Sequence, residues 1–225
     1  MFQALSIGEQ FMKYIFLAIF IIATAVHLYA SLKKNRKLRN ITKPFILLAL
    51  LGFYVFAADN VLFTIVLALL LSWLGDVLLI PIGVKWFTAG GIAFMLSHLS
   101  FILGYSNDID FSSINLLTVI LLALFFICLV CFIFSKLKPH LHRKLFYPMF
   151  FYLLINGAMN CFSIFRYLSM PSGRTLITCI GAILFFISDA SLFFVRFKKN
   201  GRLQTHFLVM LTYSLGELLI IIGLL

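Results

Sequence analysis

The chain has 225 residues, of which 63% are hydrophobic and 11% are charged, and its mean hydropathy is +1.12. Soluble domains carry about 25% charged residues, and a soluble chain of this size could not hide so much apolar surface from water. Unbroken apolar runs fill the sequence, whereas an outer-membrane barrel would show short alternating segments. The composition therefore predicts an all-α polytopic membrane protein and excludes a soluble domain, a disordered chain and a disulfide scaffold.

Apolar runs between polar breaks predict eight transmembrane helices, which form a single transmembrane domain over residues 1–225. We expect the spans at residues 14–30, 43–58, 61–80, 87–104, 113–134, 145–168, 175–195 and 203–224. The second span is short, and only Asp59 and Asn60 separate it from the third. This spacing is typical of a tight helical hairpin.

Basic residues predict the orientation of these spans. The 18 Lys and Arg outnumber the 7 Asp and Glu, for a formal net charge of +11. They stand mostly in short loops, where they set topology and contact anionic lipid head groups, so we expect no nucleic-acid partner. The positive-inside rule places both termini outside a bacterial inner membrane. Fifteen of the 18 then fall in four cytoplasmic segments, at residues 31–43, 81–86, 135–144 and 196–202.

A faint internal repeat relates two halves of the chain, residues 1–111 and 112–225. The matched pairs are S-W-L-G-D-V-L-L at 72–79 with F-I-S-D-A-S-L-F at 186–193, M-L-S-H at 95–98 with M-L-T-Y at 210–213, and T-K-P-F-I-L-L at 42–48 with Y-P-M-F-F-Y-L-L at 147–154. In the last pair, a proline would open the second helix of each half. Four spans per half predict a parallel four-plus-four repeat that brings Asp76 and Asp189 to equal depth. Matches this short also arise by chance.

Three acids, Asp76, Asp189 and Glu217, are each surrounded by apolar residues. A carboxylate near the middle of a bilayer costs at least about 2.5 kcal/mol, so such residues usually face a bundle interior or an aqueous cavity. Asp76 and Asp189 should both lie roughly 6 to 11 Å inside the cytoplasmic boundary, where Lys43 also enters the membrane, and Glu217 should lie deeper. We expect a cavity open to the cytoplasmic side around the first two acids and Lys43. The alternative is that each acid pairs with a basic or amide partner and locks two helices together.

Five further polar side chains fall inside the spans: His98, Tyr152, Asn156, Asn160 and Tyr213. The three on the sixth span are spaced by four residues and form one polar stripe. Such groups either line a site or form interhelical hydrogen bonds. Four other histidines near the cytoplasmic boundary are interpreted as interface residues: His27, His140, His142 and His206. The chain has no H-E-x-x-H, G-x-S-x-G, Walker A or histidine-box motif, so we expect neither a metal nor a cofactor.

Several motifs together resemble the YhhN family, from the second span to the last. They are K-P at 43–44, L-G-D-V-L-L at 74–79, G-G-I-A-F-M-L-S-H at 90–98, G-A-I-L-F-F-I-S-D at 181–189 and Y-S-L-G-E-L-L-I at 213–220. The characterised members of the family are lysoplasmalogenases. The resemblance implies eight helices and hydrolysis of the vinyl ether bond of lysoplasmenylcholine or lysoplasmenylethanolamine, which gives a fatty aldehyde and glycerophosphocholine or glycerophosphoethanolamine. The chain departs from the family pattern at Glu217, usually Gln, and at Phe101, often Tyr, which bears on substrate details.

This chemistry suits the buried acids. A vinyl ether is protonated at carbon to give an oxocarbenium ion, water adds, and the hemiacetal collapses, which requires one carboxylic acid and one carboxylate. Two neighbouring carboxyl groups in a low-dielectric pocket cannot both ionise, so we expect Asp76 and Asp189 to be catalytic. Which of them is the acid stays open. We expect Lys43 to bind the lipid phosphate and to hold one carboxylate ionised. The other residues expected to bind substrate are His98, Tyr152, Asn156, Asn160, Tyr213 and Glu217.

The partner expected from this interpretation is a lysophospholipid within the surrounding membrane lipid. Head-group preference and oligomeric state cannot be read from the sequence. The alternative function is a proton-coupled lipid or small-molecule transporter, because paired membrane acids and internal repeats are also features of transporters. The residues alone leave enzyme and transporter nearly even, and the family resemblance favours the enzyme. A purely structural scaffold is disfavoured because it would bury three acids without need.

Overall fold

The computed structural model describes residues 7–197 and 206–225. Within them it contains eight α-helices and no strand, so the predicted all-α fold is confirmed. The helices are α1 (Ile7–Leu32), α2 (Arg36–Ala57), α3 (Phe63–Leu78), α4 (Val84–Ser106), α5 (Leu116–Leu137), α6 (Phe146–Ser169), α7 (Gly173–Phe197) and α8 (His206–Leu224). Three short 3₁₀ helices also occur, η1 (Phe111–Ser113), η2 (Lys138–His140) and η3 (Arg143–Leu145).

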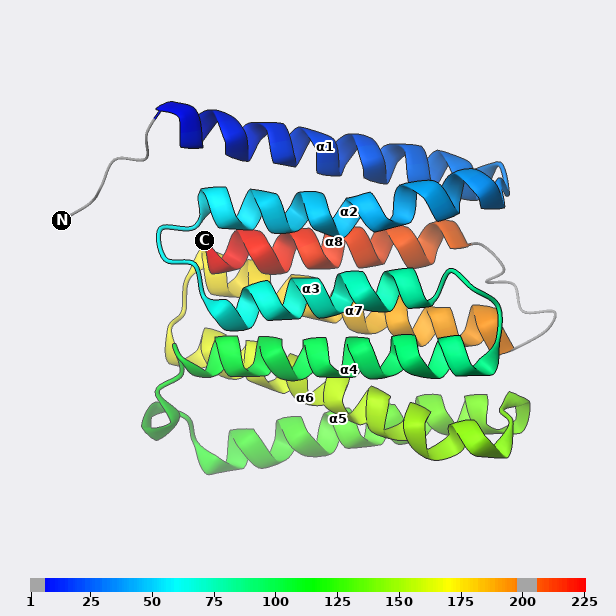
Figure 1. The fold of residues 1–225 in the computed structure, drawn as a ribbon. Helices are drawn as coiled ribbons and strands as arrows, with labels where there is room; N and C mark the ends of the chain where they lie inside the picture. Colours follow the sequence, from blue (N-terminus) through cyan, green and yellow to red (C-terminus); the bar gives the residue numbers. More distant parts are fainter. Residues whose placement is uncertain (1–6, 198–205) are drawn as a thin grey trace.

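Successive helices run in opposite directions, so the bundle has two ends (Figure 1). The start of α1 and the finish of α8 lie at one end. The connections at residues 33–35, 79–83 and 138–145 lie at the other, which we call the basic end because Lys and Arg gather there. Of the fourth predicted basic segment, residues 198–202 lie outside the described residues.

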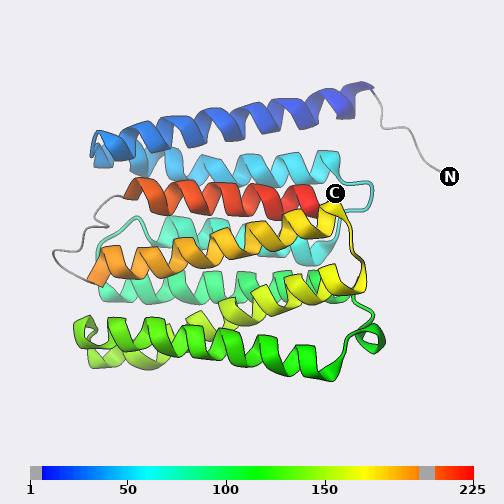
Figure 2. The same cartoon turned by 180° about the vertical axis from the view of Figure 1, so that it is seen from behind.

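The surface and the interior of the bundle have opposite polarity. Seven of the eight helices described are long and apolar enough to cross a membrane. Helices α1 and α5 form opposite edges of the bundle (Figures 1 and 2) and expose large apolar side chains, including Ile22 on α1 and Leu121 and Phe125 on α5. Acidic and amide side chains, such as Asp189 and Asn156, are instead buried. Such an apolar exterior around buried polar groups is the pattern of an integral membrane protein.

Helix α2 begins seven residues before the predicted span at 43–58, so that boundary is wrong. Asn35 caps the helix, since its side chain accepts a hydrogen bond from the backbone N–H of Leu38 at 3.1 Å. The cap and the good helix propensity of Arg and Lys extend the helix beyond its apolar part. Pro44 therefore lies inside α2 and does not open it, contrary to the prediction. Because proline has no N–H, the carbonyl of Asn40 loses its intrahelical partner.

Helix α3 is shorter than its predicted span at 61–80. Its 16 residues cover roughly 24 Å, whereas the hydrocarbon core of a bilayer is about 30 Å thick. Pro81 disfavours helix at the residue before it, and Gly83 follows with a φ of 143°, which favours glycine. Residues 79–82 are therefore irregular, a backbone that a membrane protein tolerates where it lines a cavity. The remaining predicted spans overlap the other six helices.

Close helix contacts fix the positions of the buried acids. Helix α7 packs against α8 (Figure 2), and a methyl group added to Gly181 would lie only 2.7 Å from the carbonyl oxygen of Gly216. Small residues permit such approach of two membrane helices. The hydroxyl of Ser188 also donates to the carbonyl oxygen of Val209 at 2.8 Å. Between α3 and α4, the hydroxyls of Ser72 and Ser97 are hydrogen-bonded at 2.7 Å.

At the end opposite the basic end, Arg166 connects four parts of the chain. Its Nε lies 2.8 Å from Oδ2 of Asp108, which follows α4. Its Nη1 donates to Oγ1 of Thr178 on α7 at 3.1 Å and to the carbonyl oxygen of Gly223 on α8 at 3.2 Å. This buried guanidinium therefore has a structural role that explains a basic residue far from the basic end.

Candidate active site

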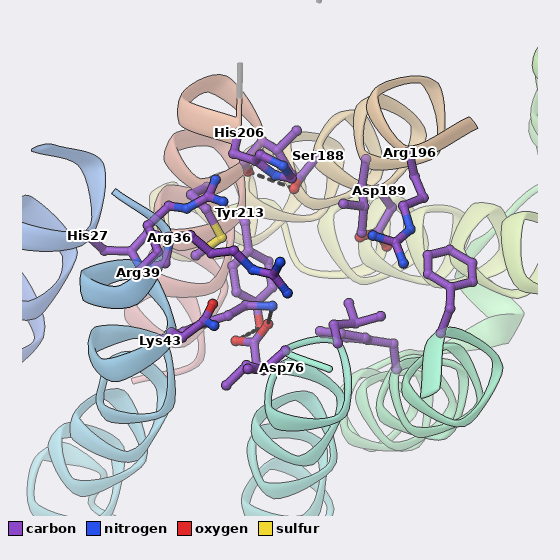
Figure 3. A pocket seen from close by; sticks show the side chains of 18 of the residues that line it. His27, Arg36, Arg39, Lys43, Asp76, Ser188, Asp189, Arg196, His206 and Tyr213 are labelled. Carbon is purple, nitrogen blue, oxygen red and sulfur yellow. Dashed lines mark hydrogen bonds and ion pairs between the residues drawn. The ribbon is translucent and has the colours of Figure 1, made fainter. Parts of the chain in front are cut away.

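A cavity of about 300 Å³ lies within the basic end of the bundle. Its wall combines side chains of α1, α2, α3, α4, α7 and α8 with residues of the irregular segment after α3. Four of the predicted site residues line it: Lys43, Asp76, Asp189 and Tyr213. The structure therefore brings both aspartates to one cavity, as the sequence analysis predicts. Figure 3 shows Lys43 and Asp76 on one side of this space and Asp189 with Arg196 on the other.

Asp76, near the end of α3, has a cationic partner. The Nζ of Lys43 lies 3.0 Å from its Oδ1, and the hydroxyl of Tyr213 donates to its Oδ2 at 3.0 Å. The aspartate side chain is 3% exposed and that of Lys43 is 16% exposed. Charge-assisted bonds of this kind favour the carboxylate form of an aspartate. Helices α2, α3 and α8 therefore meet at Asp76.

Asp189, on α7, has only uncharged donors on one of its oxygens. Its Oδ2 accepts hydrogen bonds from the hydroxyl of Tyr152 and from Nδ2 of Asn156, the latter at 2.8 Å, both on α6. Nε2 of His98 lies 3.5 Å away from the same atom, which is longer than a good hydrogen bond. No Lys or Arg in the described ranges forms an ion pair with Asp189. The other oxygen, Oδ1, accepts no hydrogen bond from those residues, and Asp189 lines the cavity.

The predicted polar stripe on α6 lies against α7. Tyr152 and Asn156 contact Asp189 directly. Asn160 does not reach Asp189, but its Nδ2 donates to the backbone carbonyl and to Oδ1 of Asn156 at 3.0 and 3.3 Å. It therefore orients Asn156. The stripe makes the interhelical hydrogen bonds that were one of its two expected roles.

Glu217 and His98 are both fully buried at 0% exposure and do not line the cavity. Neither carboxyl oxygen of Glu217, one turn after Tyr213 on α8, has a hydrogen-bond partner of good geometry within the described part of the chain. The His98 ring packs against the rings of Tyr152 and Phe185, at centroid distances of 5.4 and 4.9 Å. Asn156 and Asn160 are likewise buried and do not line the cavity. Their direct contact with substrate stays a prediction.

Three arginines that the sequence analysis assigned to topology also line the cavity: Arg36, Arg39 and Arg196. None of them makes an ion pair with a carboxylate among the residues described, and the buried Nε of Arg39 has no hydrogen-bond partner there. Figure 3 shows Arg36 and Arg39 on the same side of the cavity as Lys43. The sequence contains a signal for two of these arginines, Arg36 and Arg39. Asn35 is a typical N-cap residue, and the basic residues that follow it at positions 36, 39 and 43 are spaced so that they lie on one helix face.

Two histidines interpreted as interface residues, His27 and His206, lie in the cavity wall as well. Nδ1 of His27 is hydrogen-bonded to Oγ1 of Thr42 at 2.9 Å, which connects α1 to α2. Helices α1 and α8 both contact α2, and a single sequence does not show that these helices are neighbours. Across residues 7–197 and 206–225, no group of three or more His, Cys, Asp or Glu side chains is arranged to hold a metal ion.

Comparison with known proteins gives one match. The sequence model of the YhhN family matches residues 38–224, from the first turn of α2 to the end of α8, a range that includes every candidate site residue predicted from the sequence. Searches of the curated proteins and of the solved structures found no match.

Proposed function

The chain belongs to the YhhN family, and on that premise we propose that it is a lysoplasmalogenase, an ether hydrolase. It cleaves the vinyl ether bond of lysoplasmenylcholine or lysoplasmenylethanolamine to a fatty aldehyde and the glycerophospho-alcohol. The observation that carries the proposal is the unequal pair of aspartates in one cavity. Asp76 has a lysine partner, whereas the donors to Asp189 among the described residues are all uncharged. The reaction needs such a difference between two carboxyl groups.

Asp189 is the general acid of this proposal. Without a cation beside it, a buried carboxyl group keeps its proton more readily than one paired with an ammonium group. Tyr152 and Asn156 both donate to Oδ2, so the proton resides on the other oxygen, Oδ1. Asp76 is the carboxylate, because Lys43 and Tyr213 stabilise its charge.

The reaction then proceeds in three steps. The proton on Oδ1 of Asp189 moves to the alkene carbon that is not bonded to oxygen, and the C=C electron pair forms the new C–H bond. Water attacks the resulting oxocarbenium carbon and gives a proton to Asp76, whose charge also stabilises the cation. The hemiacetal collapses to the aldehyde: its hydroxyl proton returns to Asp189, the C–O bond to glycerol breaks, and the glycerol oxygen takes the proton held by Asp76, so both carboxyl groups regain their starting states. Water supplies the atoms that are added, so the reaction needs no oxidant or reductant.

The arginines supply a site for the lipid phosphate. Arg36, Arg39 and Arg196 line the cavity and have no carboxylate partner in the described residues. A guanidinium group binds phosphate through two parallel N–H···O hydrogen bonds. Lys43 already contacts Asp76, so its main role is to hold that carboxylate ionised. Tyr213 and Lys43 remain close enough to the cavity to contact substrate.

Buried polar residues that do not line this cavity support the aspartates. Tyr152 and Asn156 orient Asp189, and Asn160 orients Asn156. His98 and Glu217 fill the interior beside this network. This role replaces direct substrate binding in the proposal, since none of Asn156, Asn160, His98 and Glu217 lines the cavity.

A panel of three lysolipids tests the function. The purified protein in detergent is incubated with lysolipids that share one head group and one chain length but carry a vinyl ether, a saturated ether or an ester. Only the vinyl ether offers an alkene whose protonation gives an oxygen-stabilised cation, so only this lipid should release aldehyde. Equal hydrolysis of the ester would indicate a phospholipase. Binding of all three without cleavage would indicate a lipid carrier, the alternative function.

A further inference from the structure

A second cavity, of about 550 Å³, lies between α4 and α6 and is lined almost entirely by apolar side chains. We call it the α4–α6 groove; Gly91, Ile92 and Met95 line it from α4, and Phe151 and Ile155 from α6. Ile92 and Phe151 are 48% and 53% exposed, so the groove opens sideways to the surface that faces lipid. Its volume falls within the range of about 300 to 1,000 Å³ typical of small-molecule sites.

Aromatic side chains separate the groove from the candidate active site. Phe87 lines both cavities. Tyr152 lines the groove, and its hydroxyl donates to Asp189 in the polar cavity. The ring of Phe193 packs between them, with centroid distances of 5.2 Å to Tyr152 and 6.1 Å to Phe87. The carboxyl group of Asp189 is therefore one aromatic layer away from an apolar groove.

We propose that the α4–α6 groove holds the single hydrocarbon chain of the substrate lipid and releases the fatty aldehyde sideways into the bilayer. This inference rests on the proposed function. A lysolipid has a charged head and one apolar chain, and the two adjacent cavities divide in the same way: arginines line one and apolar side chains line the other. A vinyl ether bond joins the head to the chain, so a lipid that occupies both cavities carries this bond past Asp189. The Phe87 ring bounds both spaces, so a rotation of this ring would connect them.

Gly91 allows the groove to be filled without disturbing the helices. A methyl group added to Gly91 would meet no atom within 4 Å, so the larger side chain of Gly91→Phe projects into open space of the groove. Gly173 has the same open surroundings but lies at the first residue of α7, outside the groove. Gly173→Phe is therefore the matched control.

The test compares two vinyl ether lysolipids, one with a long alkenyl chain and one with a chain of four carbons. Gly91→Phe should lower kcat/KM for the long-chain lipid at least tenfold relative to the short-chain lipid, whereas Gly173→Phe and the wild type should show the same ratio as each other. An unchanged ratio in an active Gly91→Phe variant would overturn the groove proposal. An equal loss with both lipids would also overturn it, since the change would then act on the reaction or the fold.

Photolabelling tests the groove independently of cleavage. A saturated lysophosphatidylcholine with a diazirine at the chain end should label residues 88–95 and 147–155 of the wild type, and Gly91→Phe should lose most of this label. Labels spread over α1 and α5, or equal labelling of the groove by a two-chain phosphatidylcholine with the same probe, would contradict the proposal. If the wild type cleaves no vinyl ether, the proposed function fails, and the labelling still decides whether the groove holds a lysolipid chain.

Discussion

Asp189 and Asp76 have different surroundings, and this difference assigns them different tasks in the proposed reaction. In Asp189→Asn, the new amide oxygen can still accept the bonds from Tyr152 and Asn156, so expression and thermal stability should stay near wild type. Turnover should be abolished, because an amide has no proton to give to carbon. Activity above about a tenth of the wild-type rate, a difference of less than about 1.4 kcal/mol in activation free energy, would mean that Asp189 is structural.

Asp76→Asn should also abolish turnover, since an amide cannot accept the proton from water. The double variant should lose little more than either single variant, because the two groups act as a unit. Single-turnover rates of the three variants measure this relation. Additive losses would show that the two carboxyl groups do not cooperate in the rate-limiting step.

Substitutions of Arg39 and Lys43 should have different kinetic effects, because the first residue binds phosphate and the second supports catalysis. A hydrogen bond to a charged group contributes about 1.5 to 3 kcal/mol, roughly ten- to hundredfold in affinity. Arg39→Gln should therefore raise KM for the lysophospholipid by this factor and leave the rate with an alkenylglycerol, which has no phosphate, unchanged. Lys43→Gln should lower kcat with both substrates, because Lys43 contacts Asp76. If Lys43→Gln raised KM and Arg39→Gln did not, Lys43 would be the residue that binds the phosphate.

At the residue scale, the sequence identified the acids but not their surroundings. Asp76, Asp189 and Lys43 stand out because charged groups are rare within apolar spans, and their distance from the span ends predicts a shared depth. Arg36 and Arg39 could not be recognised in the same way. They stand in a basic segment whose composition is explained equally well by the positive-inside rule.

At the scale of the helices, close packing of α7 on α8 positions Tyr213 relative to Asp189. A methyl group on Gly181 would approach both the carbonyl oxygen of Gly216 and the backbone nitrogen of Ile220 at 2.7 Å. Gly181→Ala should therefore lower the melting temperature in detergent, as overpacking typically costs about 1 to 3 kcal/mol. Gly91→Ala, which meets no atom within 4 Å, is the matched control and should melt with the wild type. Equal melting of both variants would show that the two helices are not in close contact.

Hydropathy predicted the number of helices, yet it misplaced both ends of α3 and the start of α2. Mean composition does not detect the Asn35 cap that starts α2 among charged residues. It also does not show that the apolar residues Leu79, Ile80 and Ile82 form an irregular cavity wall. The errors at the start of α2 and at the end of α3 both fall at the candidate site, where irregular backbone is tolerated because it lines a cavity.

At the scale of the whole molecule, we propose that the basic end faces the cytoplasm, with both termini outside the inner membrane. Reporter fusions after residues 34, 82 and 140 should then indicate a cytoplasmic location, and fusions after residues 60, 110 and 172 should indicate the outside. The candidate active site would open to the cytoplasmic side. A fusion that reports the opposite side at any of these positions would show that a helix does not cross the membrane.

The repeat of residues 1–111 and 112–225 stays a prediction. Both of its aspartates reach the same cavity, which agrees with the equal depth expected of them. Their partners differ, however, since Asp76 contacts Lys43 on α2 and Asp189 contacts Tyr152 and Asn156 on α6. No sequence motif could have predicted this asymmetry, because it depends on which side chains face each other across helices.

Proton transfer from Asp189 to carbon is the central claim, and the reaction in D₂O tests it most directly. The aldehyde is trapped by reduction, and the hydrogen isotopes on the carbon next to the former carbonyl are determined. Delivery from one fixed carboxyl group predicts one deuterium on this carbon in a single configuration, and Asp189→Asn should form no such product. Aldehyde with deuterium in both configurations equally, or with none on this carbon, would contradict the account.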